Sequence, residues 1–286
     1  MKGKAPIFFV AALALLAIVE TANALLAPWR VAGEADWAAA AAEVRAGFRD
    51  GDLIVFAPYW ADQHGRAVLG DKMTLEMAGH ADTDRYRRIW QVSIRGAQAP
   101  DVGALKAAHR SQHGKVAVAL FEKDAVEISY DFTAHADEAR VTQSTIAGGN
   151  ETPCYRNGEG FRCGALQIEP RTLEIDYQPR RGILAPPEGG RSTRLEFADV
   201  PMGRTLVGYT GIHDYFSRKN ADGPVDFKVL LDGQERLAQR TVNADGYKRF
   251  SVDTAALAGQ KHTVRFEISA PDPAWRTFGF HVESRK

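Results

Sequence analysis

The chain has 286 residues, of which 45% are hydrophobic and 25% are charged, a composition typical of a globular protein with a core and not of a disordered chain. Its 36 basic residues balance 36 acidic ones, so no net charge attracts the protein to nucleic acid or to an anionic membrane surface. Nucleic acid is therefore not an expected partner, and the length suits one large domain or two ordinary ones.

The N-terminus carries an export signal. Lys2 and Lys4 precede an uninterrupted apolar run over residues 5–19, and "ANA" at residues 22–24 fits the small-residue rule for signal cleavage. The apolar character continues to Trp29, however, and a span of about 20 residues is long enough to anchor a protein in a membrane. We therefore expect an exported protein, periplasmic or extracellular, whose leader is either a cleaved signal peptide or a membrane anchor.

The next segment alternates between helical and strand patterns. "ADWAAAAAEVRAGFRDGD" places Trp37, Ala41 and Val44 at helical spacing, and "LIVFAP" is a continuous apolar run typical of a strand covered on both sides. The order then repeats, with helices expected around residues 69–77 and over "PDVGALKAAHRSQHG", and strands expected at "RIWQVSI" and "KVAVALF". This alternation predicts a small parallel α/β layer.

The pattern changes in the second half of the chain. "AVEISYDF" alternates, and Asp232-Gly233 between two apolar runs is a strong hairpin signal. Further short strands are expected at "LEIDYQP", "TRLEFADV", "RTLVGYTGI", "VDFKVLLDG", "RLAQRTV", "YKRFSVDT", "HTVRFEIS" and "RTFGFHVE". Short strands at this spacing predict an antiparallel, jelly-roll-like β-sandwich. The expected fold class is thus α+β with two domains.

Two cysteines, Cys154 and Cys163, lie in the polar stretch "NETPCYRNGEGFRCG". In an exported protein we expect them to form a disulfide, because a metal site needs more ligands than two nearby thiols and no histidine lies between them. The expected organisation is a signal peptide or anchor at residues 1–29, an α/β domain at 34–135, a disulfide-containing connection at 136–164 and a β-sandwich at 165–286.

The loop "APYWADQHGRAVLGD" is a first candidate binding site, because it follows the "LIVF" strand and the carboxyl end of a strand is where open α/β sheets usually bind ligands. Its residues could hold a sugar or a phosphate-bearing lipid headgroup, with an arginine on the anion and a tryptophan on the ring. In the alternative interpretation, its aromatic residues pack on the neighbouring domain. The candidate ligand-binding residues are Tyr59, Trp60, Asp62, His64 and Arg66.

A second candidate is "TGIHDYFSRKN", which leaves a strand at the rim of the expected sandwich. His213 and Asp214 could hydrogen-bond sugar hydroxyls, Tyr215 could stack on a sugar ring, and Arg218 could pair with a carboxylate or phosphate. The alternative is that these side chains only brace the loop.

The stretch "DPAWRTFGF" adds Trp275 and Arg276, where an exposed tryptophan would be a sugar platform and a buried one would belong to the core. His109 and His113 lie four apart near an expected helix end, but no HExxH arrangement accompanies them. No metal or cofactor is therefore expected. The chain also has no Gly-x-Ser-x-Gly elbow, dinucleotide fingerprint or P-loop.

Two resemblances bear on function. "EADWAAAAAEVRAGFRDGDLIVFAP" after an apolar segment resembles the extracytoplasmic α/β portion of lipid-linked-sugar glycosyltransferases of the protein-mannosyltransferase type. Their catalytic acids lie beside membrane helices that this chain lacks, so no catalytic residue is carried over. The second half resembles galactose-binding-like sandwiches, which often serve as carbohydrate-binding modules. Together these resemblances imply a role in glycan assembly, a carbohydrate or lipid-linked sugar as ligand, and a membrane protein as a possible partner.

A non-catalytic carbohydrate- or glycolipid-binding protein of the cell envelope is the favoured interpretation. One alternative is an enzyme acting on envelope glycan, either a hydrolase using Asp62 and His64 or an accessory subunit of a transferase. Another is a structural surface on which a membrane complex assembles.

Overall fold

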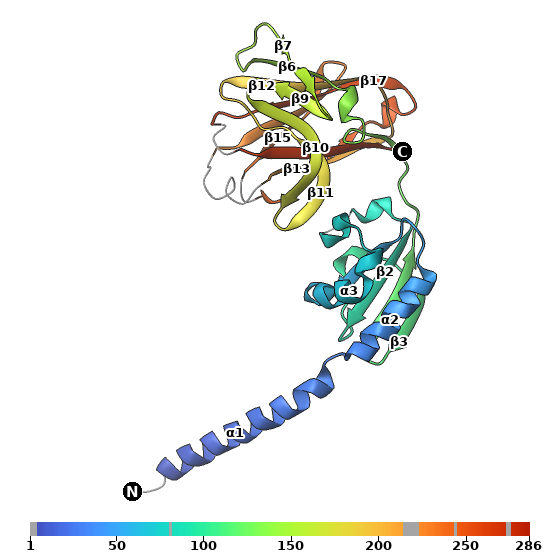
Figure 1. The fold of residues 1–286 in the computed structure, drawn as a ribbon, viewed down its shortest axis with the longest axis vertical. Coiled ribbons are helices and arrows are strands. Elements are labelled where there is room, and N and C mark those ends of the chain that lie inside the picture. The colour runs from blue at the N-terminus through green and yellow to red at the C-terminus, as the bar shows by residue number, and fades with distance from the viewer. Residues whose placement is uncertain (1–4, 80–81, 214–222, 243–244, 273–275) are drawn as a thin grey trace. The chain divides into compact units, whose positions relative to one another are not determined.

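The structure is a computed structural model that describes residues 5–79, 82–213, 223–242, 245–272 and 276–286. The chain forms two compact units: unit 1 contains residues 1–73 and 86–124, and unit 2 contains residues 74–85 and 125–286 (Figure 1). The chain therefore passes from one unit to the other three times. This division differs from the expected boundaries, because a short segment from the middle of the first half belongs to the second unit.

Helix α1 (Ala5–Arg30) contains one stretch, Phe9–Leu26, that is long and apolar enough to cross a membrane, with a mean hydropathy of 2.1. Its described side chains are exposed. Eighteen residues at 1.5 Å each span about 27 Å, close to the thickness of the hydrocarbon core of a bilayer. The helix fits a membrane anchor, and a signal sequence has the same features.

The body of unit 1 is a four-stranded sheet with a helix packed on one face. The strands are β1 (Leu53–Ala57), β2 (Arg88–Ile94), β3 (Ala107–His113) and β4 (Val116–Glu122), in the order β1-β2-β4-β3. Helix α2 (Glu34–Gly47) buries Trp37, Ala40, Ala41 and Val44 against Ile54, Phe56, Trp90 and Val92 of the sheet. The spacing predicted from "ADWAAAAAEVRAGF" is thus confirmed as the core-facing side of a helix.

The sheet is mixed, so the expected parallel layer is wrong in one respect. Only β1 and β2 are parallel, while β2 with β4 and β4 with β3 are antiparallel. The segment expected as a helix over residues 100–114 forms one 3-10 turn (Pro100–Val102) and then strand β3. Its alternate residues 109, 111 and 113 reach Glu43 on α2, a period of two, and Gly114 has the positive φ of 55° that a tight turn into β4 requires.

Around residues 69–77 the expected helix is replaced by short helical pieces. Helix α3 (Asp62–Leu69) follows a 3-10 turn (Tyr59–Ala61), and three more 3-10 turns lie at Gly70–Lys72, Leu75–Ala78 and Thr83–Arg85. The last two turns belong to unit 2.

Unit 2 is an antiparallel β-sandwich, which confirms the predicted architecture of the second half. One sheet has the order β16-β13-β18-β11-β10-β9-β8, with β5 paired to β18, and the other has the order β15-β14-β17-β12-β6-β7. The strand bounds are β5 (Ile128–Asp131), β6 (Arg140–Thr145), β7 (Thr152–Pro153), β8 (Tyr155–Asn157), β9 (Gly160–Cys163), β10 (Leu166–Ile175), β11 (Gln178–Leu184), β12 (Arg191–Pro201), β13 (Thr205–Ile212), β14 (Val225–Leu231), β15 (Gln234–Thr241), β16 (Lys248–Asp253), β17 (Lys261–Ser269) and β18 (Phe278–Arg285). Two 3-10 turns, Ala136–Glu138 and Ala255–Leu257, lie between strands.

The core of the sandwich is rich in aromatic residues. Phe132, Phe197, Phe227, Phe266 and Phe280 are fully buried and contact one another, with ring centroids 4.9–5.9 Å apart in the contacting pairs. Residues 136–164, expected as a connection, contribute to both sheets, because β6 pairs with β12 and β9 pairs with β10. The two layers and their buried rings make unit 2 a single folded body.

Three hairpins show where the local sequence decided the structure. Asp232 and Gly233, with φ of 48° and 80°, join β14 to β15 as predicted. The run "LEIDYQP" is a hairpin and not one strand, because Asp176 and Tyr177 also have positive φ and turn β10 into β11. The predicted disulfide between Cys154 and Cys163 is present, with 4.7 Å between the Cα atoms, and it closes the β8–β9 hairpin.

Candidate ligand-binding site

A pocket of about 390 Å³ opens on unit 2, within the size range usual for ligand sites. We call it the hairpin pocket, because the disulfide-closed β8–β9 hairpin supplies part of its lining. The residues that give it chemical character are Thr133, Asp137, Arg156, Glu159, Pro170 and Arg181.

Three chain segments position these side chains. Arg156 and Glu159 come from the β8–β9 hairpin, and Arg181 comes from β11, next to β10 in the same sheet. Thr133 lies in the turn after β5, where the carboxylate of Asp131 accepts hydrogen bonds from the backbone N–H of Thr133 at 2.8 Å and of Ala134 at 3.2 Å. These backbone bonds fix the turn, so the pocket is formed by constrained elements.

The charged groups of the pocket fall into two kinds. Arg156 is already engaged: its guanidinium donates to the backbone carbonyl of Asp137, lies 3.7 Å from the Asp137 carboxylate and lies 5.5 Å from the ring centroid of Phe161. Arg181 and Glu159 are exposed, and their side chains have no hydrogen bond or ion pair with the residues that the structure describes. The pocket therefore offers one cation and one carboxylate to a ligand.

A hydroxyl group adds to these two charges. Thr133 is 3% exposed, and its Oγ1 has no hydrogen-bond partner among the described residues. A buried polar atom without a partner costs free energy, so a ligand that bonds it gains affinity. The hairpin pocket thus combines a donor group, an acceptor group and a hydroxyl that can do both.

The predicted rim site of unit 2 is seen only in part. Nδ1 of His213 accepts a hydrogen bond from the backbone N–H of Glu174 at 2.8 Å, so this side chain ties the end of β13 to β10. Arg276 is 2% exposed and is therefore buried instead of presented to solvent. Asp214, Tyr215, Arg218 and Trp275 lie outside the described residues.

The predicted site of unit 1 is brought together on one loop, but its polar members are engaged locally. Asp62 and Arg66 form an ion pair at 2.5 Å, and the ring of His64 stacks on Trp37 with 5.9 Å between centroids. Tyr59 and Trp60 are 60% and 54% exposed. Tyr59, Trp60 and His64 are thus the exposed side chains among these candidates, whereas Asp62 and Arg66 are partly buried.

The two histidines considered for a metal are both on β3, on the same side of the strand. Nε2 of His109 lies 2.8 Å from the Glu43 carboxylate, Ser111 donates to the same carboxylate at 2.5 Å, and His113 also contacts it. Within the described ranges, no group of three or more side chains is arranged to hold a metal ion. His109 and His113 thus serve to bond strand β3 to Glu43 of helix α2.

A second pocket, of about 400 Å³, lies on unit 1, and its lining includes Gln91, Ser93, Arg110 and Gln112 together with alanine and valine residues of β4. The amide of Gln91 donates to Ser93 at 3.4 Å and accepts from the backbone N–H of Ala99 at 2.8 Å, and Gln112 donates to the carbonyl of Gly114. Because its amides are satisfied within the protein, this pocket offers fewer groups to a ligand than the hairpin pocket does.

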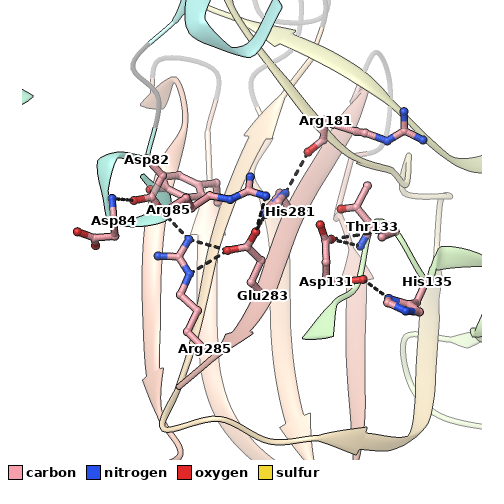
Figure 2. A network of polar contacts seen from close by, with 12 residues as sticks. Asp82, Asp84, Arg85, Asp131, Thr133, His135, Arg181, His281, Glu283 and Arg285 are labelled. Atoms are coloured by element: carbon pink, nitrogen blue, oxygen red, sulfur yellow. Dashed lines mark hydrogen bonds and ion pairs between the residues drawn. The ribbon is translucent and has the colours of Figure 1, made fainter. Parts of the chain in front are cut away.

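Unit 2 also contains a buried charge network that no local sequence pattern predicted, formed by Asp82, Arg85, His281, Glu283 and Arg285 (Figure 2). Arg285 joins its two carboxylates, donating to Asp82 at 2.6 Å and to Glu283 at 2.9 Å. Tyr209 also donates to Asp82, at 3.0 Å. Arg85 and His281 each lie 3.3 Å from Oε1 of Glu283, outside hydrogen-bond geometry.

Burial sets the protonation of this network. Burial alone would raise the pKa of Asp82, but the hydrogen bond and charge of Arg285 hold that pKa below its usual value. Burial raises the pKa of Glu283, and Arg85 and Arg285 oppose this only in part. Burial, with the charges of nearby arginines in addition, lowers the pKa of His281 to about 3. His281 is therefore neutral near pH 7, with its Nδ1 donating to the carbonyl of Arg181 at 3.1 Å.

Comparison with known proteins gives no family. No family model matches the chain, and no curated protein matches it, so the transferase resemblance of the first half finds no support. Among solved structures, the CBM51-2 and INT domains of Clostridium perfringens ZmpB share 12% identity over 56% of this chain and 40% of that chain, with a TM-score of 0.33. CBM27-1 of Caldicellulosiruptor saccharolyticus, in complex with mannohexaose, shares 11% identity over 57% of this chain and 96% of that chain, with a TM-score of 0.32.

A third similar structure is CBM51 of Clostridium perfringens GH95 in complex with methyl-galactose, at 12% identity over 41% of this chain and 79% of that chain, with a TM-score of 0.29. Each of these three structures contains a carbohydrate-binding module. The description of unit 2 as a β-sandwich comes from the pairing of its own strands in two sheets.

Proposed function

We propose that this protein is an exported, membrane-anchored and non-catalytic protein that binds carbohydrate at the hairpin pocket. The observation that carries the proposal is the set of groups left for a ligand there: the guanidinium of Arg181, the carboxylate of Glu159 and the buried hydroxyl of Thr133.

The chemistry of these groups matches a sugar. Each hydroxyl of a sugar both donates and accepts hydrogen bonds, so it can satisfy a carboxylate and a guanidinium at the same time. The two arginines and two carboxylates that line the pocket balance in charge, which favours a neutral, hydroxyl-rich ligand over a simple anion. The disulfide in the β8–β9 hairpin limits the movement of that part of the lining, and a preformed site loses less entropy on binding.

Two features support the location. The apolar helix α1 fits an anchor, and disulfides persist in oxidising compartments outside the cytoplasm. The ligand is accordingly a glycan of the cell envelope, free or as part of a lipid-linked sugar. A role in glycan assembly beside a membrane-protein partner extends the same proposal.

Binding is favoured over hydrolysis. The hydrolase alternative used Asp62 and His64, but Asp62 is held by Arg66 and His64 stacks on Trp37. Both side chains are thus engaged by their neighbours within unit 1.

Binding of full-length protein in detergent to a glycan array, followed by calorimetry with the best ligand, tests the proposal. Each charged hydrogen bond contributes about 1.5–3 kcal/mol, so Arg181→Ala and Glu159→Gln should each weaken binding roughly ten- to a hundredfold. Arg236→Ala, on strand β15 of the other sheet, is the matched control and should bind as the wild type does. No binding by folded protein, or binding that survives both pocket substitutions, would contradict the proposal.

A further inference from the structure

One edge of the unit 1 sheet combines exposed aromatic rings with cations. Tyr59 and Trp60 follow the end of β1 and are 60% and 54% exposed. Arg95 follows the end of β2, is exposed, and places its guanidinium 5.3 Å from the centroid of the Trp60 ring. Because β1 and β2 are parallel, both ends lie at the same edge. Large amphipathic rings beside a cation are typical of surfaces that meet lipid headgroups.

The same edge lies beside the end of α1. Val31 directly follows α1, and its backbone carbonyl accepts a hydrogen bond at 3.1 Å from Nζ of Lys115. Lys115 precedes Val116, which pairs with Ile94, the last residue of β2. Lys115, before β4, and Arg95, after β2, therefore lie at the same end of two neighbouring strands, and Trp60 follows β1, the strand next to β2. With about 4.8 Å between strands, the aromatic residues lie roughly 10 Å along this edge from Lys115.

The length of α1 sets the height of this edge above a membrane. If Phe9–Leu26 fills the hydrocarbon core, the five residues from Leu26 to Val31 rise about 7.5 Å at 1.5 Å each. The headgroup layer on one side of a bilayer is about 5–8 Å thick. Val31 is thus at the level of the headgroups. Lys115 bonds Val31, so the edge of the sheet that contains Lys115 lies at the same level.

We propose that this edge docks in the headgroup layer of the bilayer that holds α1, with Tyr59 and Trp60 at the interface and Arg95 on lipid phosphate. The proposal rests on the anchoring part of the proposed function and is independent of the sugar ligand. The guanidinium of Arg95 can bond a phosphate through two N–H groups. The carboxylate nearest in sequence, Asp62, is neutralised by Arg66, so it does not repel anionic lipid. Docking fixes one face of unit 1 on the membrane.

The test uses the full chain reconstituted in phosphatidylcholine–phosphatidylglycerol vesicles that contain a lipid brominated near the headgroup. The emission of Trp60 is obtained as the difference between the wild type and Trp60→Phe. We expect this emission to lie at short wavelength and to be lost in brominated vesicles. The emission of Trp37, obtained in the same way from Trp37→Phe, should be unchanged, because Trp37 is 6% exposed in the core of unit 1.

A charge reversal provides the second arm. Arg95→Glu should restore the Trp60 emission in brominated vesicles, whereas Arg49→Glu should not, because Arg49 is exposed at the opposite edge, in the loop between α2 and β1. Flotation of the vesicles after an alkaline wash reports anchoring separately. Protein that floats with unquenched Trp60 would overturn docking and leave the anchor intact, and protein that is washed off would overturn both. The glycan measurement is unaffected by either result.

Discussion

Glu43 in unit 1 and Glu283 in unit 2 each gather three polar partners, but they do so at different depths. The side chain of Glu43 is 22% exposed, and its partners His109, Ser111 and His113 all lie on β3. The side chain of Glu283 is 0% exposed. Its neighbours are His281 and Arg285 on the same strand and Arg85 from a distant segment.

The difference determines what each cluster contributes. Water screens a surface cluster, which then adds little to stability. A buried charge that loses its partner stays desolvated and unpaired, and this costs several kcal/mol. Unit 1 therefore depends on its apolar core between α2 and the sheet, whereas unit 2 also depends on charges that must be present together.

The largest expected effect comes from removing the cation that joins the two buried carboxylates. Arg285 is 4% exposed, so Arg285→Ala should lower the free energy of unfolding of unit 2 by about 3–5 kcal/mol. Denaturant unfolding followed by circular dichroism measures this loss, and Arg236→Ala on the exposed strand β15 should change stability by about 0.5 kcal/mol or less. If Arg285→Ala lowers the free energy of unfolding as little as the control does, the buried cluster around Glu283 contributes no more to stability than the cluster around Glu43.

A smaller effect is expected from the histidine of the buried network. Its folded pKa of about 3 lies below the unfolded value of 6.5, so the unfolded state binds the proton first. The contribution of neutral His281 to the free energy of unfolding is therefore complete above pH 6.5. It is lost as the pH falls below 6.5, at about 1.4 kcal/mol per pH unit. Glu283, whose pKa is raised, acts in the opposite direction, because the folded state protonates it more readily.

Comparing the wild type with His281→Gln isolates the histidine from Glu283. Between pH 6.5 and pH 5, the free energy of unfolding should fall more steeply for the wild type than for the variant. The groups that face His281 and must stay in place in the variant are Asp82, Arg85, Arg180, Glu283 and Arg285. Equal slopes would mean that His281 takes up its proton in the folded state and is hydrated.

The smallest effect is expected at the surface cluster. The pKa of Glu43 is lowered, because hydrogen bonds from Ser111, His113 and His109 outweigh the effect of burial, which raises it. Glu43→Gln keeps the shape and removes the charge, and we expect it to lower the stability of unit 1 by less than about 1 kcal/mol. Tryptophan fluorescence follows unit 1, since Trp37 and Trp90 lie in its core. A loss comparable to that of Arg285→Ala would contradict the contrast between the two units.

Sequence patterns correctly predicted the elements whose structure depends on residues close together in the chain. The sandwich strands alternate because one face is buried, Asp232-Gly233 fits a turn with two positive φ values, and the two cysteines are close enough in sequence to pair. Strand β3 was wrongly expected as a helix, because "ALKAAHRSQH" contains good helix formers. Pairing with β4 and the contacts to Glu43 override that propensity.

The hairpin pocket and the buried network could not be predicted in this way. Arg156 and Arg181 come from separate strands, so their approach depends on the sheet. On β18, His281, Glu283 and Arg285 alternate with the buried residues Phe280, Val282 and Ser284, and such alternation is usual where one face of a strand is open to water. Asp82 and Arg85, which come from a distant segment of unit 2, contact that face instead, and Asp82 is 203 residues away from its partner Arg285. No local signal connects positions so far apart.

That separation has a consequence for how the protein is made. A chain grows at roughly 5–20 residues per second, so Arg285 is synthesised about 10–40 s after Asp82. Strands β1 and β2, on either side of residues 74–85, can pair in the meantime. The segment that carries Asp82 then stays looped out from the unit 1 sheet, which has already formed. It remains so until β18, the last strand of the sandwich, is synthesised and Arg285 binds Asp82.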